Sequence, residues 1–239
     1  MKYACYCMTR NMYFKTIPAI RSLLINSDVD KVFLIIEDDT IDLELWYETP
    51  FSQAPYIECI NVSGQTFFPR DSPNFNSRWT YMVMMRTALP FLLPGVDKIL
   101  SLDCDTIVDG DISDLWDIDI TNDYYAAVRE PSTSQRKGFT SCNMGVAMFN
   151  LEKLRDGMAE KVIRELNTTH HQFKEQDVLN DFCRPYIKEL DSRYNACRFT
   201  STTDTPLIHH FAAERNWHNK PLVKKYLFEV IPPERLRSF

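Results

Sequence analysis

The first 36 residues contain the pattern that restricts the fold of this chain most strongly. An apolar stretch at Tyr3–Met8 is followed by apolar residues at helical spacing from Ile17 to Leu24, with Pro18 near the start of the expected helix. Lys31–Ile36 is a continuous apolar and β-branched run, which is typical of a strand buried on both faces. A strand, a helix and a strand in this order form a βαβ unit. The pattern therefore predicts a parallel sheet and an α/β fold.

The rest of the chain continues to alternate apolar strands with amphipathic helices. Further strands are expected at Tyr56–Val62, Ile99–Leu102, Tyr124–Val128, Asn143–Phe149 and Leu207–Phe211. Further helices are expected at Trp79–Leu92, Leu151–Leu166 and Glu175–Phe182. Because we find neither a repeat nor a linker, we expect one domain over residues 1–215. Residues 216–239 are expected to form a helical, partly irregular C-terminal extension that packs on it.

Composition places the chain among globular proteins. Of its 239 residues 44% are hydrophobic and 25% are charged, and Gly and Pro together are only 19, which excludes disordered and collagen-like chains. No apolar run approaches the roughly 18 residues of a membrane span. The N-terminus has no signal-peptide pattern, and the seven Cys have no disulfide-framework spacing. We therefore expect a cytoplasmic protein.

Negative charge is concentrated in one segment. Asp97–Asp123 holds nine Asp and one base, Lys98, so this segment has a formal charge of −8. The whole chain has a formal net charge of −6, so the remaining residues together carry +2. A nucleic-acid partner would require a basic groove, and the sequence indicates none. A dense acidic segment indicates either a solvated face or a site for a hard cation.

Two carboxylates inside this segment directly follow the expected strand Ile99–Leu102. Asp103 and Asp105 are two residues apart, so in extended backbone they point to the same side, with Cα atoms about 6.5–7 Å apart. Ligands of open α/β sheets bind at the carboxyl ends of strands. Such a pair repels itself unless a cation neutralises it, and Mg²⁺ or Mn²⁺ prefers oxygen ligands. The pair is thus either two solvated acids at a strand end or a metal site open to substrate phosphates.

Segments rich in candidate functional residues recur along most of the chain. They read MTRNMYFKTIPAIRSLL, TYMVMMRTALPFLL, LSLDCDTIVDGDISDLWD, CNMGVAMFNLEKLR, KEQDVLND and IHHFAAERNW. In order and approximate spacing they resemble the motifs of glycosyltransferase family 8, a family of retaining sugar transferases. Single segments of this kind are weak indications, whereas the ordered set is specific.

The resemblance implies a GT-A type fold, with a mixed, mostly parallel central sheet between helices, and a UDP-sugar donor. It also implies Mn²⁺, or Mg²⁺, held by Asp103, Asp105 and a C-terminal His, for which position favours His210 over His209. The residues that it implies for donor binding are Thr9, Asn11, Arg86, Asp103, Cys104, Asp105, Asn143 and Arg215.

The same resemblance places Gln176 and Asp177 near the reacting carbon, and Glu130 at sugar hydroxyls as an acceptor residue. Since an amide is a poor nucleophile, Gln176 favours front-side attack over a covalent intermediate, while Asp177 would bind donor hydroxyls. Taken alone, Gln176 and Asp177 are also ordinary first-turn helix residues.

The chain departs from the family pattern at several positions. Ala213 replaces a Gly whose backbone approaches the diphosphate, and Glu175 replaces the first Asp of the D-Q-D motif. The Lys-Pro pair before Trp217 is missing, and of the two residues that could replace its cation we favour Arg215, because it can bind phosphate bidentately, over Asn216.

We therefore expect a retaining transferase that moves a hexose, glucose or galactose, from a UDP-sugar to a carbohydrate, glycolipid or protein acceptor. One alternative is a haloacid-dehalogenase-like phosphohydrolase, because ILSLDCDT matches the D-x-D-x-T signature with Asp103 as nucleophile, Asp105 as acid–base and Mg²⁺ as cofactor. Another is a sugar-nucleotide-binding protein without activity. The basic tail from Lys220 is interpreted as a solvated helix face or a peripheral membrane contact.

Overall fold

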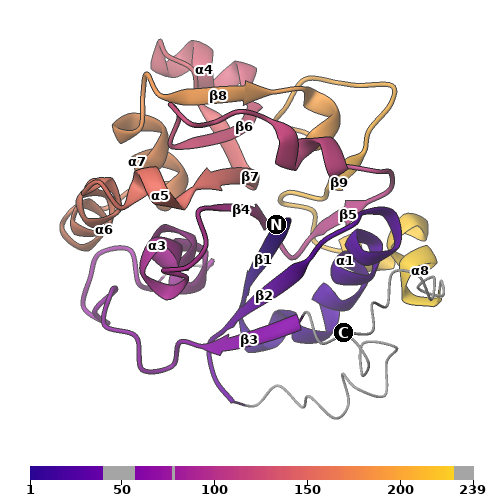
Figure 1. Ribbon diagram of the computed structural model, residues 1–239, viewed down its shortest axis with the longest axis horizontal. Coiled ribbons are helices and arrows are strands. Elements are labelled where there is room, and N and C mark those ends of the chain that lie inside the picture. Colours follow the sequence, from indigo (N-terminus) through magenta and orange to yellow (C-terminus); the bar gives the residue numbers. More distant parts are fainter. Residues whose placement is uncertain (40–56, 77–78, 229–239) are drawn as a thin grey trace.

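A seven-stranded sheet runs through the molecule in the order β3-β2-β1-β4-β7-β6-β8 (Figure 1). The computed structural model describes residues 1–39, 57–76 and 79–228. The strands are β1 (Tyr3–Met8), β2 (Lys31–Ile36), β3 (Ile57–Asn61), β4 (Lys98–Leu102), β6 (Tyr125–Arg129), β7 (Cys142–Asn150) and β8 (Ile187–Leu190). The described helices of α type are α1 (Tyr13–Asn26), α3 (Leu89–Leu92), α4 (Pro131–Lys137), α5 (Leu151–Leu154), α6 (Met158–Thr168), α7 (Glu175–Phe182) and α8 (Pro221–Phe228).

The pairing of the strands confirms the expected mixed, mostly parallel sheet. The four strands β3, β2, β1 and β4 are parallel, and β6 and β8 are also parallel to each other. β7 is antiparallel to both β4 and β6. As a result, the carboxyl ends of β1, β4 and β6 and the amino end of β7 meet at one edge of the sheet.

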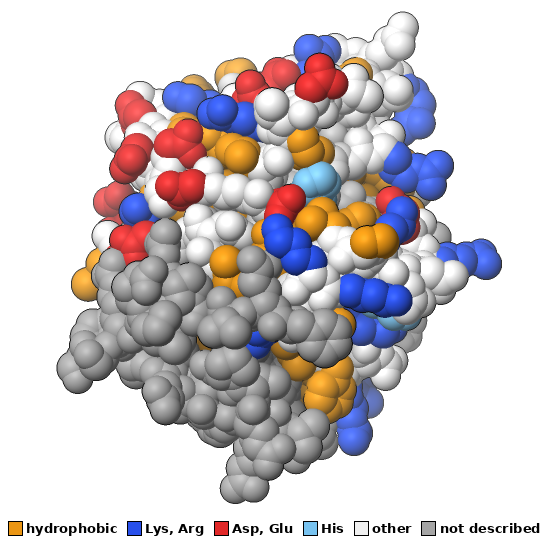
Figure 2. Space-filling view, turned by 90° about the vertical axis from the view of Figure 1, so that its right-hand side faces the viewer, with side chains coloured by type: hydrophobic (Ala, Val, Ile, Leu, Met, Phe, Trp, Pro, Cys, Tyr) orange, Lys and Arg blue, Asp and Glu red, His pale blue; other side chains and the backbone are white. Residues whose placement is uncertain are grey.

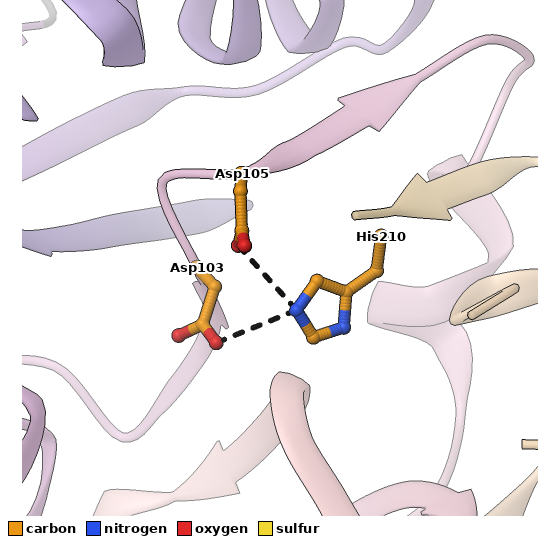
Figure 3. A group of neighbouring side chains, drawn as sticks. All are labelled: Asp103, Asp105 and His210. Carbon is orange, nitrogen blue, oxygen red and sulfur yellow. Dashed lines mark ion pairs between the residues drawn. The ribbon is translucent and has the colours of Figure 1, made fainter. Parts of the chain in front are cut away.

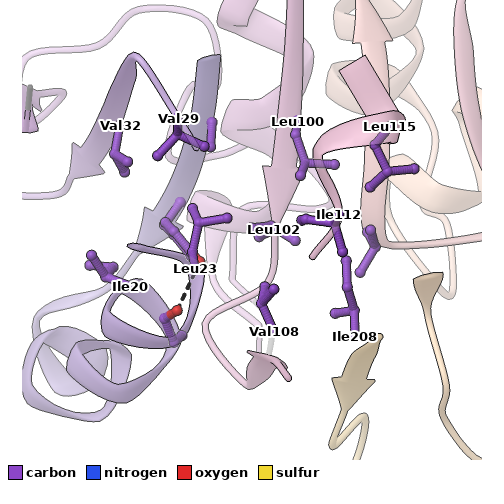
Figure 4. Close-up of a cluster of buried hydrophobic side chains, with 14 of the residues drawn as sticks. Ile20, Leu23, Val29, Val32, Leu100, Leu102, Val108, Ile112, Leu115 and Ile208 are labelled. Carbon is purple, nitrogen blue, oxygen red and sulfur yellow. Dashed lines mark hydrogen bonds between the residues drawn. The ribbon is translucent and has the colours of Figure 1, made fainter. Parts of the chain in front are cut away.

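Two apolar clusters cover the two faces of this sheet and give the molecule three layers. On one face α1 and the 3₁₀ turn η4 (Ser113–Asp117) pack on β1, β2 and β4, where Ile20, Leu23, Leu100 and Leu115 are fully buried (Figure 4). The other face is covered by α3, α5, α6, α7 and the 3₁₀ helix η3 (Tyr81–Ala88). The alternation of side chains along a strand explains the division, since Tyr6 of β1 joins the first cluster and its neighbour Cys5 the second.

A small antiparallel sheet of β5 (Thr106–Val108) and β9 (Ile208–His210) lies beside the large one. It is supported by α8, whose Val223 and Tyr226 pack with Ile107 and Trp217 in a third apolar cluster. The backbone carbonyl of Tyr226 also accepts a hydrogen bond from the buried Arg21 of α1, at 2.8 Å. The helix α8 therefore packs on α1 and on the small sheet, whereas residues 229–239 lie outside the described residues.

The structure differs from the sequence expectation in three places. Trp79–Leu92 is not one α-helix, because η3 precedes α3 and Pro90 lacks the N–H that a continuous helix would bond to the carbonyl of Arg86. Leu151–Leu166 is divided into α5 and α6, and the break falls at Gly157, which has a φ of 103°. The elements β5, β8 and α4 were not expected, and residue 56 of the third expected strand lies outside the described residues.

Charged side chains of both signs share the face of the molecule in Figure 2. Most Asp and Glu side chains lie on the upper left of this view, and Lys and Arg side chains follow its right-hand side. Within the described part of the chain, no helix combines the length and the apolar character that crossing a membrane requires.

Candidate active site

The expected carboxylates lie at the edge of the sheet where several strand ends meet. Asp103 follows β4 directly, and its backbone N–H donates to the carbonyl of Gly145 in β7, at 2.8 Å. The chain then turns, since Thr106 bonds back to the carbonyl of Asp103 through both its backbone N–H (3.2 Å) and its hydroxyl (2.8 Å). This turn leaves Asp103 and Asp105 between β4 and β5, at the carboxyl end of a central strand, where ligands of α/β sheets bind.

The small sheet brings His210 to these carboxylates from far along the sequence. His210 of β9 pairs with Thr106 of β5, and the next residue, Phe211, donates its N–H to the carbonyl of Asp105 at 3.0 Å. His210 is buried, with 5% of the residue exposed, whereas His209 is half-buried. The alternation of the strand thus turns His210, and not His209, toward Asp103 and Asp105.

The three side chains converge on one point (Figure 3). The Nε2 atom of His210 lies 3.4 Å from Oδ1 of Asp105 and 3.6 Å from Oδ2 of Asp103. One ligand atom from each residue can be chosen so that all three lie within 4.8 Å of one another. Among the described residues, this is the group of His, Cys, Asp and Glu side chains that can surround a single metal ion.

Electrostatics at this point favour opposite charges on the His and its neighbours. Burial opposes ionisation of Asp105, but the nearby His210 outweighs it and lowers the pKa of the Asp105 carboxyl. Burial likewise opposes a charged imidazole, yet the Asp105 carboxylate raises the pKa of His210 well above its ordinary value. The site therefore attracts positive charge, whether it is a proton on Nε2 or a cation.

The donor set fits a divalent cation. Two carboxylates suit Mn²⁺ and Mg²⁺, both of which prefer oxygen ligands, and one imidazole beside them gives a mixed site that Mn²⁺ can occupy. The other ring nitrogen of His210, Nδ1, lies 2.9 Å from Oδ1 of Asn195 and is occupied there. Nε2 is consequently the nitrogen that faces the carboxylates and could ligate a metal.

Arg86 is buried beside Asp103. Its guanidinium is buried and donates to Asp103 and to the backbone carbonyl of Met144, and its Nε lies 3.5 Å from Glu175. Burial disfavours the charged guanidinium, but Asp103 and Glu175 raise the pKa of Arg86 above its ordinary value. Arg86 therefore holds Asp103 in place and connects it to the start of α7.

The residues expected near the sugar form a hydrogen-bonded group. Gln176 accepts from the N–H of Met144 at 3.1 Å and donates to Glu130 at 3.4 Å, and Asn143 donates to the same oxygen of Glu130 at 2.7 Å. The carboxylate of Asp177 is bound by the ammonium group of Lys137 at 2.7 Å and by a backbone N–H at 2.8 Å. Gln176, Asn143 and Glu130 are thus brought together, while Asp177 is held in an ion pair beside them.

The other expected donor residues are spread around the same edge. Thr9 and Asn11 follow β1, where Asn11 is exposed. Cys104, which stands between Asp103 and Asp105 in the sequence, is buried, and its thiol donates to the carbonyl of Cys7 at 3.5 Å. Arg215 is exposed in the turn after β9, next to Ala213, whose φ is 61°. That left-handed conformation is the one that glycine adopts without cost.

Sequence reasoning missed two contributors to this site. Asn195 contacts both His210 and Asn143, at 2.9 Å each. Thr133 of α4 donates its hydroxyl to Glu130 at 2.8 Å. Neither residue lies in one of the motif segments. Asn195 is 15 and 52 residues away from its two partners in sequence, so no local pattern pointed to it. Thr133 lies three residues after Glu130, but on α4, which was not expected.

Comparisons with known proteins agree with this geometry. The family model described as "Glycosyl transferase family 8" matches residues 4–220. The chain is 32% identical over 179 residues to the glycosyltransferase GlyE of Streptococcus pneumoniae, covering 74% of this chain and 42% of that protein. It is also 26% identical over 162 residues to a lipopolysaccharide 1,2-glucosyltransferase of Escherichia coli, covering 55% of this chain and 48% of that protein.

Solved structures show the same fold. The crystal structure of the galactosyltransferase LgtC with donor and acceptor sugar analogues superposes with a TM-score of 0.68 at 17% identity, covering 95% of this chain and 94% of that one. A GlyE crystal structure superposes with a TM-score of 0.69 at 20% identity, covering 98% of this chain and 62% of that one. These neighbours establish the GT-A fold.

The chain spans about half the length of the curated relatives it matches. The family model nevertheless covers almost all of the described residues, including both carboxylates and His210. The match favours a transferase over a haloacid-dehalogenase-like phosphohydrolase. The chain belongs to glycosyltransferase family 8.

Proposed function

We propose that this protein is a retaining hexosyltransferase that transfers glucose or galactose from a UDP-sugar to a carbohydrate, glycolipid or protein acceptor. In this proposal Asp103, Asp105 and His210 hold a divalent cation, Mn²⁺ or Mg²⁺. The observation that carries it is the convergence of these three side chains, with ligand atoms within 4.8 Å of one another, at the carboxyl end of a central strand.

The relatives support the sugar-transfer chemistry and the choice of a hexose. The names of two of them state transfer of glucose and of galactose, respectively. When bound, the cation would supply Lewis-acid stabilisation of the charge that builds up on the diphosphate leaving group. Exposed Arg215, in the turn after β9, would add a charge-assisted hydrogen bond to the same phosphates.

The buried side chains would position these groups. Arg86 binds Asp103 and the carbonyl of Met144, so its contribution to donor binding acts through the orientation of Asp103. Thr9 and Asn11 at the end of β1, with Cys104, would complete the donor site. Preorganised donors of this kind are each worth about 3–4 kcal/mol in transition-state stabilisation in well-studied enzymes.

Transfer with retention requires the acceptor oxygen to attack on the face from which the diphosphate leaves. The bond from the anomeric carbon to the phosphate oxygen breaks, a bond to the acceptor oxygen forms, and the acceptor proton passes to the departing phosphate. Gln176 is fixed by Met144 and Glu130 and would stabilise the positive charge on the sugar. Glu130 and Asn143 would bind sugar hydroxyls on the acceptor and donor sides, and Asp177 would bind donor hydroxyls.

The first test is a panel of UDP-sugars assayed for hydrolysis and transfer, with and without Mn²⁺. We expect turnover of UDP-glucose or UDP-galactose that is lost in a chelator and restored by Mn²⁺. The variants Asp103→Ala and Asp105→Ala should remain folded and lose at least about 10²-fold in kcat. Exposed Asp117 in the same acidic segment provides the matched control, because Asp117→Ala changes the net charge equally.

Two results would contradict the proposal. Hydrolysis of a simple phosphate ester without any need for a nucleotide-sugar would favour the phosphohydrolase. Binding of UDP with Mn²⁺ but no turnover of any donor would show a sugar-nucleotide-binding protein without activity.

A further inference from the structure

We propose that Asn195 is a positioning residue that keeps the proton of His210 on Nδ1 and thereby presents the Nε2 lone pair to the metal. This inference rests on the proposed metal site, and it concerns a residue outside every motif of the sequence. Asn195 lies directly after the 3₁₀ turn η5 (Ser192–Tyr194), on a segment that runs beside β9.

Asn195 is the middle member of a chain of hydrogen bonds that starts at His210. Its Oδ1 lies 2.9 Å from Nδ1 of His210, and its Nδ2 donates to Oδ1 of Asn143 at 2.9 Å. Asn143 in turn donates through Nδ2 to Oε1 of Glu130 at 2.7 Å. The chain thus runs from the candidate metal ligand to the residue that also binds Gln176.

The direction of every bond in this chain is fixed by its other partners. The Oδ1 atom of Asn143 also faces the backbone N–H of Gly145 at 3.0 Å, and a backbone N–H can only donate. With Oδ1 on this side, the Nδ2 group of Asn143 faces Oε1 of Glu130 and donates to it. Asn143 therefore turns its Oδ1 toward Asn195, and Asn195 must donate to it through Nδ2. The Oδ1 of Asn195 then faces His210 and can only accept, so Nδ1 of His210 must carry a proton.

This constraint opposes the influence of the carboxylates on the other side of the ring. Asp103 and Asp105 both lie near Nε2, at 3.6 and 3.4 Å, and in a metal-free protein they favour a proton there. A proton on Nε2 would block the lone pair that a metal needs. Asn195 holds the proton on Nδ1, so that Nε2 would present its lone pair to a bound cation. Hydrogen-bond partners of the other ring nitrogen do the same for metal-ligating His residues in general.

Because Asn195 is buried, water cannot take over the hydrogen bonds of its side chain. Its side chain is fully buried, and Asn143, Glu130 and His210 are each at least nine-tenths buried. A buried donor that loses its acceptor finds no substitute in the solvent. Loss of the Asn195 amide would therefore leave Nδ1–H of His210 and Oδ1 of Asn143 with one partner fewer.

The test compares Asn195→Leu with the wild-type protein in two measurements. In metal-free protein, ¹⁵N-resolved NMR should show a hydrogen-bonded, slowly exchanging Nδ1–H proton of His210 in the wild type and its loss in Asn195→Leu. In the presence of UDP, Mn²⁺ titration should give a Kd about 10–100-fold higher for Asn195→Leu. Asn195→Asp retains an acceptor for Nδ1–H and should restore the NMR signal.

Asn150→Leu is the matched control. Asn150 is another buried amide, at the far end of β7, where it bonds to the carbonyl of Ile120 and the N–H of Lys153. It should cost stability without changing the NMR signal of His210 or the Kd for Mn²⁺. A purely structural role of Asn195 would give the same result as this control.

The outcomes separate the inference from the proposed function. A folded Asn195→Leu variant with an unchanged Nδ1–H signal and a Kd within twofold of wild type overturns the role of Asn195 alone. If that variant does not fold, absence of a slowly exchanging Nδ1–H signal in the wild type overturns it. A wild type that binds no Mn²⁺ with UDP overturns the metal site itself.

Discussion

The backbone of Gly145 and the imidazole ring of His210 are in direct contact. A Cβ atom built on Gly145 would lie 2.1 Å from Cε1 of His210, a separation at which the ring must move. The same glycine accepts from the N–H of Asp103 through its carbonyl and donates its own N–H to Asn143. Gly145 of β7 therefore contacts two of the candidate metal ligands. It binds the backbone of Asp103 through its carbonyl, and its lack of a side chain leaves room for the ring of His210.

Gly145→Ala is expected to disturb the site more than the fold. The added methyl group displaces His210 from Asp103 and Asp105, so affinity for Mn²⁺ in the presence of UDP should fall at least tenfold. Overpacking of this kind costs about 1–3 kcal/mol of unfolding free energy. Mn²⁺ titration and denaturant unfolding measure the two effects. Gly95→Ala is the control, since a Cβ there meets no atom within 4 Å, and equal metal affinity in both variants would contradict the contact.

Ala213 is the residue at which a glycine should stabilise the protein. Its φ of 61° is left-handed, which costs about 1–2 kcal/mol for a residue with a Cβ. Ala213→Gly removes this cost, but glycine also makes the unfolded chain more flexible, which offsets part of the gain in stability. The variant should therefore raise the unfolding free energy by about 0.5–1 kcal/mol. Ala212→Gly at the buried neighbouring position should instead lower it. Thermal or denaturant unfolding of both variants decides, and destabilisation by Ala213→Gly would contradict the assigned conformation.

Glu175 gives the stability of the metal-free protein a specific pH dependence. Burial, opposed by Arg86, raises the pKa of Glu175 from 4.5 to about 7. Between these two values the unfolded carboxyl has lost its proton and the folded one has kept it, so the contribution of Glu175 to stability falls as the pH rises through this window. The total change is at most about 3 kcal/mol.

Glu175→Gln removes this titration. Relative to the wild type, the variant should gain stability as the pH rises from about 5 to about 8, by up to the same 3 kcal/mol. Denaturant unfolding of both proteins at the two pH values measures the difference. A stability difference that is the same at both pH values would show that Glu175 titrates normally in the folded protein.

Val223 tests whether the C-terminal helix belongs to the core. Its side chain is fully buried in the cluster that supports β5, which carries the chain from Asp105 toward its pairing with β9. Val223→Asp should cost about 3 kcal/mol or more, because it buries an unpaired charge. Lys224→Asp introduces the same residue at an exposed position and should stay within about 0.5 kcal/mol of wild type. Similar unfolding midpoints for the two variants would mean that α8 is dispensable.

The part of the fold that follows a simple periodicity could be predicted from the sequence. The run Lys31–Ile36 is a strand with the expected bounds, and Asp103 does follow the strand that ends at Leu102. These predictions depend on neighbouring residues only, and the burial of one strand face makes them reliable.

The parts that failed or were missed depend on contacts between distant segments. β5 has only three residues and becomes a strand because β9, about a hundred residues later, pairs with it. Asn195 contacts Asn143, which is 52 residues away in sequence, and no pattern marks either residue as a partner of the other. Arg86 was expected at the donor, which stays a prediction. Its contacts with Glu175 and Met144 were not expected, because they follow from the packing of η3 on β1 and α7, which periodicity does not reveal.

The most direct test of the account is a crystal structure of the protein grown with Mn²⁺ and UDP, with anomalous scattering recorded for manganese. We predict one strong anomalous peak in bonding contact with a carboxylate oxygen of Asp103, one of Asp105 and Nε2 of His210, with the diphosphate on its open side. A structure with UDP bound and no manganese at these three side chains, or with the two carboxylates turned away from each other, would contradict the account.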